Sequence, residues 1–387
     1  MRRAISFVGT GNYQETSYFY GDREFRTNLF PEAVYDIFRP DVMIVFLTQA
    51  AENKYMSELN KRLAGKNWRP VRIPEGKKED EIWEIFETIT QNVEVDDELI
   101  FDITHAFRSI PLLAMISIMY LRSAKKIKLE SVVYGAFEAT ENGRTPVFDL
   151  TPFMKLIDWT NATEMFIRTG HGRDIADLLR NAHQVAYRTD RPDGRSPPRE
   201  LKNVARDIEA ISNAIALARS NEVMKHALRL KNRPESYREE ARYWAKPFSL
   251  LVDRIAESFV PFACDETDIS GRLRTEYRII EWLLDKNQIV QAILLAREWI
   301  VTYVIHKLGE RHIQDSDLRK RIEEKMNDAM EWGDLPVDRN LLDIWSRLAD
   351  LRNDAAHCGM RSNPRPYDAF IRGVREIHEE LRRFAEL

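Results

Sequence analysis

The sequence predicts an α/β domain of the Rossmann-like kind, followed by an all-α region. Two observations lead to this prediction. Over the first 150 residues, short runs rich in β-branched and aromatic residues alternate with longer runs that have helical periodicity. From about Leu156 onward the helical periodicity continues almost to the C-terminus, and no clear strand pattern returns. Alternation of strand and helix favours a doubly wound sheet with helices on both faces.

Six runs in the first part have the pattern of strands. Several are almost continuously apolar, which is typical of parallel strands that are covered on both faces. The predicted strands cover residues 3–11, 41–49, 68–74, 97–104, 129–138 and 145–151. The predicted helices between them cover residues 29–38, 52–64, 79–93 and 110–124.

The remainder of the chain is predicted to be helical throughout, apart from two loops at 187–200 and 264–271. We divide the chain into a ligand-binding domain over 1–155, a helical connecting region over 156–270 and a separate helical domain over 271–387. In the last domain we predict helices over 272–285, 288–308, 317–332, 339–355 and 367–385.

The composition excludes several classes of protein. The formal net charge is −4, so the chain lacks the basic excess of an avid, non-specific nucleic-acid binder. Its two cysteines, Cys264 and Cys358, form no CxxC motif, which argues against a disulfide scaffold and a structural zinc site. We expect Cys358 to be a small buried or half-buried thiol. No run of 18 or more apolar residues occurs, so we expect no membrane span and a cytoplasmic protein.

Polar residues follow the predicted strands of the first domain, at the sheet edge where α/β proteins bind ligands. The first strand ends in GTGNYQ, residues 9–14, with two of the three glycines of a dinucleotide fingerprint. Its backbone N–H groups suit a phosphate, although a simple turn explains the pattern equally well. The second strand ends at Thr48 and Gln49.

Among the predicted strands, the fourth has the most polar C-terminal end, in the stretch FDITHAFRS. Thr104 or Ser109 suits the cap of the helix that follows. Asp102 can orient either His105 or the backbone, and Arg108 can hold a phosphate or pair with Asp102. Capping and an ion pair would explain half of this pattern. The three strand ends together favour a nucleotide-type ligand.

A different chemistry is indicated near the C-terminus, where RNDAAH places Arg352 and His357 five positions apart. Metal-free RNA cleavage needs proton transfer near neutral pH, which suits an imidazole. It also needs stabilisation of charge on phosphorus, which suits a guanidinium. Asn353 adds a neutral hydrogen-bond donor.

The spacing alone does not establish a site, because chance supplies such a pair in a chain so rich in arginine. On a straight helix the two side chains would lie ~140° apart. They can meet if the helix ends near Ala356, as Gly359 suggests, or across a dimer axis. The alternative is a histidine that merely interacts with the helix dipole. A second pair, Arg372 and His378, lies in a charged pattern typical of a surface, and we expect no function from it.

Four stretches together resemble the CARF–HEPN ribonucleases, which are ancillary proteins of type III CRISPR systems. They are FVGTGNYQ, DITHAFRSIP, LLAREWIVTYV and RNDAAH. The resemblance covers most of the chain, but little of 156–270. It implies that 1–155 is a CARF domain that binds a cyclic oligoadenylate, with the tetra-adenylate as the expected ring, and that 271–387 is a HEPN nuclease domain.

The resemblance also implies which residues form the two sites. Those expected to line the activator site are Gly9, Thr10, Gly11, Asn12, Gln49, Asp102, Thr104, His105 and Arg108. In the HEPN domain, Arg352 and His357 correspond to the catalytic arginine and histidine, with Asn353 as the polar residue after the arginine. Glu298 resembles an acidic position of an earlier HEPN helix, although a solvated helix face explains it as well.

The function implied is a metal-independent endoribonuclease without a cofactor, which cuts single-stranded RNA when a cyclic oligoadenylate made by a type III CRISPR complex binds. It would act as a homodimer or a higher even oligomer. Two alternatives stay open. One is a nucleotide sensor without nuclease activity, whose helical part recruits a partner or DNA. The other is a nuclease whose CARF domain also opens its cyclic activator.

Overall fold

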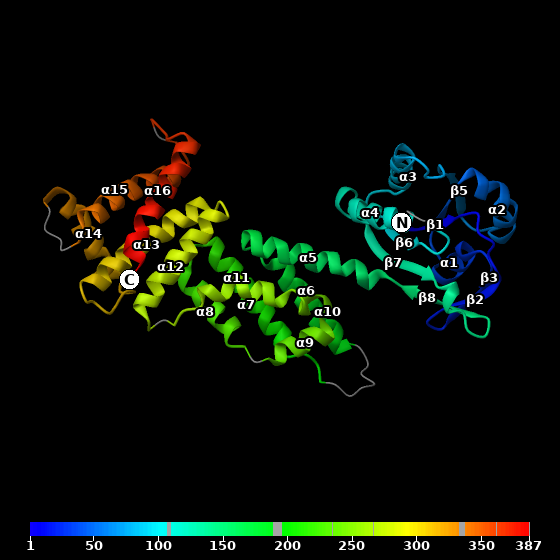
Figure 1. The fold of residues 1–387 in the computed structure, drawn as a ribbon, viewed down its shortest axis with the longest axis horizontal. Coiled ribbons are helices and arrows are strands. Elements are labelled where there is room, and N and C mark those ends of the chain that lie inside the picture. The colour runs from blue at the N-terminus through cyan, green and yellow to red at the C-terminus, as the bar shows by residue number, and fades with distance from the viewer. Residues whose placement is uncertain are drawn as a thin grey trace. The chain divides into compact units, whose positions relative to one another are not determined.

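The computed structural model describes residues 1–106, 110–188, 196–233, 235–265, 267–332, 337–360 and 362–386. The chain divides into two compact units, Met1–Leu156 and Ile157–Leu387 (Figure 1). The first unit is α/β and the described part of the second is helical, which confirms the predicted fold class.

The first unit is built on an eight-stranded mixed sheet. Its strands are β1 (Arg2–Val8), β2 (Thr16–Tyr20), β3 (Arg23–Thr27), β4 (Val42–Leu47), β5 (Trp68–Arg72), β6 (Glu98–Asp102), β7 (Lys128–Gly135) and β8 (Arg144–Asp149). The order across the sheet is β3-β2-β8-β7-β6-β1-β4-β5. Strands β7, β6, β1, β4 and β5 are parallel, whereas β8 pairs antiparallel with β7. The sheet therefore has a Rossmann-like parallel core with an antiparallel extension.

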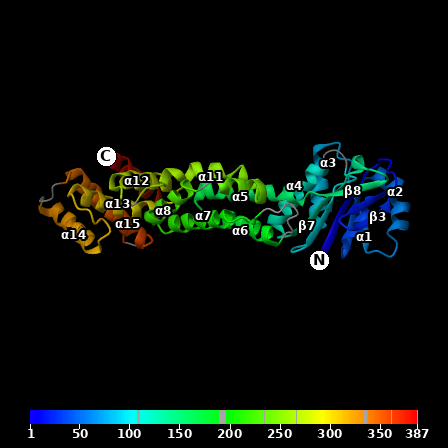
Figure 2. The ribbon, with the colours of Figure 1, turned by 90° about the horizontal axis from the view of Figure 1, so that it is seen from below.

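Four helices connect the parallel strands: α1 (Phe30–Phe38), α2 (Gln49–Arg62), α3 (Glu79–Gln91) and α4 (Ile110–Ala124). Crossovers between parallel strands are right-handed. The chain moves outward from β1 through β4 to β5, and then returns to β6 and β7 on the other side of β1. Helices α1 and α2 therefore cover one face of the sheet and α3 and α4 the other (Figures 1 and 2).

The apolar side chains alternate between these two faces, as the period of a strand requires. One hydrophobic cluster joins Ala4 and Val45 to the buried sides of α1 and α2, including Phe30 and Leu59. On the opposite face Phe7 stacks on Phe46, with ring centroids 5.3 Å apart. Burial on both faces is the reason why the central strands are almost continuously apolar.

The hairpin of β2 and β3 was not predicted from the sequence. Its strands are only partly buried, so no apolar run marks them. The turn between them is Gly21-Asp22, and Gly21 has the left-handed φ of 56° that a glycine adopts without strain. Two β-rich runs separated by a Gly-Asp pair predict a hairpin, so the sequence did contain this information.

The second unit consists of helices in its described part. After α5 (Thr151–Thr169), which begins in the first unit, they are α6 (Arg173–Arg188), α7 (Glu200–Ala216), α8 (Ser220–Lys231), α9 (Ser236–Trp244), α10 (Lys246–Ser249), α11 (Val252–Phe259), α12 (Ile269–Asp285), α13 (Ile289–Lys307), α14 (Ser316–Trp332), α15 (Arg339–Ala356) and α16 (Tyr367–Ala385). The last five agree with the predicted helices to within three residues at each end.

One hydrophobic core runs through this unit, from Trp159 to Ala385. In the C-terminal part of this core, helix α13 contacts α12, α14, α15 and α16 (Figure 2). By length and composition this helix could cross a membrane, but 67% of its most apolar stretch is buried inside the structure, as in the core helix of a globular protein. Because the core is continuous, the boundary predicted between 156–270 and 271–387 stays a prediction.

The pair Arg372 and His378 differs from the surface pattern expected for it. Arg372 is exposed and lies 3.6 Å from Asp368, but His378 is buried and stacks on Tyr277 with ring centroids 4.6 Å apart. This burial lowers the pKa of His378. The expectation was wrong for His378 because it lies on the apolar stripe of α16, one residue after the buried Ile377.

Candidate functional site

The first candidate site lies where β1 and β6 are neighbours in the sheet. The connections that follow these two strands leave in opposite directions, which makes their carboxyl ends a topological switch point of the sheet. Open α/β sheets bind ligands at such a switch point. The loop after β1 contains residues 9–12, and the segment after β6 begins at Ile103. The topology thus brings two of the predicted strand ends together.

Lys54 of α2 holds the loop after β1 in place. Its ammonium donates hydrogen bonds to the carbonyl oxygens of Thr10 and Gly11, at 2.9 and 3.1 Å, and to Oδ1 of Asn12 at 2.5 Å. Lys54 was not predicted as a site residue from the sequence, because its contacts join positions more than 40 residues apart.

A cluster of aromatic rings also contacts the loop after β1. Tyr13 lies between Tyr55 and His105, with ring centroids 5.2 and 3.7 Å away. The hydroxyl of Tyr13 accepts the N–H of Gly9 at 3.0 Å, and Tyr55 donates to the carbonyl of Gly11. Burial raises the pKa of Tyr13 to about 12, so its hydroxyl keeps its proton. Gly9 is buried, and its N–H already donates to Tyr13. This corrects the expectation that the N–H of Gly9 is free to bind a phosphate.

His105 is a neutral member of this cluster. Its Nε2 accepts the N–H of Phe30 at 3.2 Å. Burial lowers the pKa of His105 to about 4, partly opposed by a backbone hydrogen bond with Asn28. At neutral pH His105 therefore brings no positive charge to a phosphate, and it contributes a flat ring and a fixed position.

Asp102 lies beneath the site and not on its surface. It is fully buried, Ser6 donates to its Oδ2, and the N–H of Thr104 donates to its Oδ1 at 2.7 Å. The hydroxyl of Thr104 accepts the N–H of Gly135 at 2.8 Å. Burial raises the pKa of Asp102 to about 6. We correct Asp102 from a lining residue to one that orients the backbone, which was one of the two roles weighed for it.

The remaining predicted residues of this site are at the surface. Thr10, Gly11 and Asn12 are exposed. Gln49 is exposed as the first residue of α2, whose N-terminus is capped by the Thr48 side chain. A helix N-terminus favours a negative charge. Arg108, the predicted phosphate ligand, lies outside the described residues.

The second candidate site lies at the end of α15, which stops one residue before His357. The N–H of Gly359 bonds to the carbonyl of Asp354 at 3.1 Å, and that of Cys358 to Ala355 at 3.0 Å. This is the Schellman arrangement, with Cys358 at the left-handed position and a φ of 52°. His357 is exposed. Cys358 is also exposed, so the expectation of a buried or half-buried thiol was wrong.

Arg352 and Glu298 line one cavity, together with residues of α13 and of the segment before α8. Arg352 is half-buried, and its Nε is buried without a hydrogen-bond partner among the described residues. Asn353 is half-buried as well. His357 is not among the described residues that line this cavity. A single chain therefore brings Arg352 and Glu298 together and leaves His357 at the exposed helix end.

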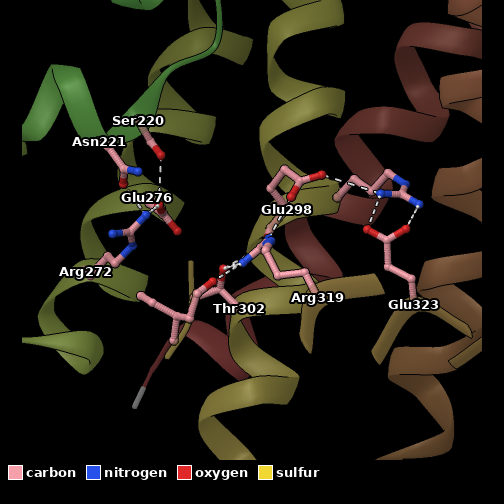
Figure 3. A network of polar contacts seen from close by, with 10 residues as sticks. Ser220, Asn221, Arg272, Glu276, Glu298, Thr302, Arg319 and Glu323 are labelled. Carbon is pink, nitrogen blue, oxygen red and sulfur yellow. Dashed lines mark hydrogen bonds and ion pairs between the residues drawn. The ribbon is translucent and has the colours of Figure 1, made fainter. Parts of the chain in front are cut away.

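Glu298 is more than a solvated helix position. It is 52% exposed, but Arg319 binds its Oε2 at 2.7 Å (Figure 3). Next to it Arg297 contacts both carboxylate oxygens of Glu323, at 2.8 and 2.9 Å. Arg297, with smaller effects from Arg319 and Arg352, lowers the pKa of Glu323. Arginines and carboxylates are thus paired around the Arg352 cavity.

Two parts of the chain are similar to known protein families. Residues 4–138 match the family described as "CRISPR system endoribonuclease Csx1, CARF domain". The first unit is therefore similar to a CARF domain over these residues. Residues 155–261 match a second family, "CRISPR-associated protein MJ1674, second domain". These matches confirm the predicted resemblance of the chain to CRISPR ancillary proteins.

Two individual proteins are similar to this chain. CRISPR-associated protein MJ1674 from Methanocaldococcus jannaschii is 34% identical over 133 residues, which are 33% of this chain and 21% of the relative. The match thus spans about a fifth of the relative's length. The structure of Enterococcus italicus Csm6 bound to cyclic hexa-2'-fluoro-hexa-dAMP aligns with all of this chain and 93% of its own, at 11% identity and a TM-score of 0.43.

Proposed function

We propose that this protein is an endoribonuclease that a cyclic oligoadenylate activates, and that it cuts single-stranded RNA in type III CRISPR antiviral defence. The activator would be made by the type III complex, with the tetra-adenylate as the expected ring. We place the protein in the cytoplasm, where such a complex and its RNA targets would be met.

The CARF site has the features that a cyclic oligoadenylate requires. Thr10, Asn12 and Gln49 offer polar groups at the surface, and the N-terminus of α2 favours phosphate. Lys54 fixes the exposed loop and adds a positive charge beside it. A two-fold axis at this sheet edge would place one ring over two copies of these residues. Thr104, His105 and Arg108 are proposed to complete the site.

The nuclease part rests on one observation. Helix α15 ends so that His357 is exposed, while Arg352, earlier on the same helix, lines a cavity with Glu298. In the proposed reaction the 2′-hydroxyl attacks the adjacent phosphorus and the 5′-oxygen leaves, which yields a 2′,3′-cyclic phosphate and a 5′-hydroxyl. His357 moves protons, Arg352 stabilises the charge that develops on phosphorus, and Asn353 donates a hydrogen bond.

A second copy of the chain would complete this chemistry. One proton must leave the 2′-hydroxyl and another must reach the 5′-oxygen, and two imidazoles from two chains can share these tasks. Two exposed apolar side chains, Leu217 and Leu294, line the Arg352 cavity, as expected for a contact surface. We therefore propose a homodimer or a higher even oligomer.

We propose that cleavage needs neither a metal ion nor a cofactor. Glu298 pairs with Arg319 and Glu323 with Arg297, so the carboxylates beside Arg352 already have cationic partners. A divalent cation would have to displace these guanidinium groups.

The test is cleavage of labelled single-stranded RNA with a panel of cyclic and linear oligoadenylates, in EDTA. We expect cutting only with a cyclic activator, and products that end in a 2′,3′-cyclic phosphate. His357→Ala should abolish cutting but keep activator affinity, whereas His312→Ala, at an exposed histidine of the same unit, should change neither. Equal rates with and without activator would contradict the proposal.

One observation favours a sensor without nuclease activity, namely that His357 does not line the cavity that holds Arg352. Such a protein would bind the activator in the same experiment and cut no RNA. Incubating labelled activator with the His357→Ala variant tests the other alternative, in which the CARF domain opens the ring itself.

A further inference from the structure

A second cavity adjoins the one that holds Arg352. Its volume is about 360 Å³, and it lies between the start of α8, the helices α12 and α13, and the segment before α14. Ala218 and Glu298 line both cavities, so the two form one continuous surface. A molecule seated at Arg352 can therefore extend a neighbouring group into the second cavity.

Charged side chains are buried at the floor of this second cavity. Arg272 is 6% exposed and Glu276 is 3% exposed. Nη2 of Arg272 lies 3.1 Å from Oε1 of Glu276 (Figure 3). Ser220 donates to the same oxygen of Glu276, Oε1, at 2.8 Å, which leaves Oε2 for a further donor. Arg272 also donates to Asn221, but its Nε is buried without a partner among the described residues. Burial of a charged pair that the fold does not fully satisfy is costly, which is typical of a binding site.

The charges that line this cavity cancel. Arg272 pairs with Glu276, Arg319 with Glu298, and the exposed Arg219 with Glu222 at 2.6 Å. A phosphate would meet three carboxylates here as well as three guanidinium groups. The cavity therefore suits a neutral group that both donates and accepts hydrogen bonds, more than an anion.

The cavity also has apolar walls. Leu295 and Ile313 are buried side chains that line it. A flat ring can lie against such side chains while its edge reaches the polar floor. This combination of apolar walls, donors and acceptors is what a site for a nucleobase needs.

We propose that this cavity holds one base of the RNA substrate, next to the phosphate at Arg352, and that Glu276 and Arg272 recognise its edge. The inference rests on the proposed nuclease function and adds its sequence preference. Guanine fits best, because its N1–H and N2–H groups match a carboxylate and its O6 matches a guanidinium. Adenine, cytosine and uracil lack two adjacent donors beside an acceptor.

The proposal is tested by sequencing the cut sites that the activated enzyme makes in a random pool of single-stranded RNA. We expect guanine to be enriched at one fixed position beside the cut. Glu276→Gln should reduce this enrichment about tenfold, because the amide replaces an acceptor by a donor. Glu164→Gln, which alters a carboxylate paired with Arg254 at 2.7 Å outside the cavity, should keep it.

A second variant covers the case in which Glu276→Gln does not fold. Gln314 is exposed at the rim of the cavity, so Gln314→Trp would obstruct the entrance without disturbing the core. It should lower the guanine enrichment, whereas Gln184→Trp, at an exposed position of α6, should not. An unchanged preference in both cavity variants would overturn the proposal. A preference for another base that Glu276→Gln abolishes would overturn the assignment to guanine.

Failure of the nuclease proposal can be recognised separately. If the wild-type protein cuts no RNA with any activator, equilibrium binding of the trinucleotides AGA and AAA still reports on the cavity. Tighter binding of AGA that Glu276→Gln removes would support the base site without nuclease activity. Equal binding of both trinucleotides would overturn it.

Discussion

At the scale of single residues, Lys54 is expected to determine how well the CARF domain binds its activator. Its three hydrogen bonds fix the exposed loop of Thr10 and Asn12. Lys54→Ala should weaken binding of cyclic tetra-adenylate about tenfold, because the loop must then be ordered on binding. Calorimetric titration measures this change. Lys61→Ala, at an exposed position of the same helix, should leave the affinity unchanged, and an equal loss there would contradict the role of Lys54.

Asp102 should give the protein a measurable pH dependence of stability. Burial raises its pKa from an ordinary 3.8 to about 6, so between these values the folded state binds more protons than the unfolded state. This contribution to the unfolding free energy is present at low pH and is lost as pH rises toward 6. Between pH 4 and pH 6, the unfolding free energy of the wild-type protein should therefore fall by up to about 3 kcal/mol relative to that of Asp102→Asn.

Denaturant titrations of both proteins across this pH range check the expectation. His105, whose pKa burial lowers to about 4, contributes with the opposite sign, but it is present in both proteins and cancels in the difference. Asp22→Asn, at an exposed turn position, is the control. A difference that does not change with pH would show that the Asp102 carboxylate is not destabilised by burial.

Single residues were the least predictable level from the sequence. The helix end before His357 could be predicted from Gly359, which has a left-handed φ of 72°, but Cys358 is left-handed as well, with a φ of 52°, and its thiol is exposed. His378 belongs to the buried stripe of its helix although charged residues surround it in sequence. Lys54 matters because of contacts with a loop more than 40 positions away, and such contacts follow from the fold and not from local pattern.

At the scale of elements, the exposed face of α4 is expected to contact a second copy of the chain. Four of its large apolar side chains are exposed at spacings that place them on one side of a helix. They are Leu112, Ile116, Met119 and Tyr120. Ile116→Glu should shift the protein toward monomers, because it places a charge in an apolar contact. Sedimentation measures the shift.

The matched control for this variant is Val95→Glu, since Val95 is an exposed apolar residue of the same unit outside α4. If both variants sediment as the wild-type protein does, α4 is not part of the contact between copies. If both dissociate, the effect does not belong to α4 in particular.

Elements were the most predictable level. Long amphipathic helices such as α16 have a period that indicates a helix, and short apolar runs rich in β-branched residues, such as β4, are typical of buried strands. The hairpin of β2 and β3 was missed because half-exposed strands lack such a pattern. The two strand ends of the CARF site were predicted to meet because parallel strands end at the same edge of a sheet, which is a property of topology.

At the scale of the whole molecule, two copies are expected to bring their α15 helix ends together. Cys358 adjoins His357 and is exposed, so it reports on this arrangement without an engineered label. A short bismaleimide should cross-link two chains through Cys358. Cys264→Ser should keep the cross-link and Cys358→Ser should remove it. If Cys264→Ser forms no cross-link, so that none runs through Cys358, the helix ends do not face each other.

The account as a whole depends on coupling between the CARF domain and Arg352 and His357. The most direct measurement is the initial rate of single-stranded RNA cleavage in EDTA, with and without cyclic tetra-adenylate, for the wild-type protein and His357→Ala. We predict that the activator raises the wild-type rate by at least about a hundredfold, as a coupling of about 3 kcal/mol allows, and that His357→Ala stays inactive while it binds the activator normally. A wild-type rate that does not respond to any cyclic oligoadenylate, or a His357→Ala variant that cuts as well as the wild type, would contradict the account.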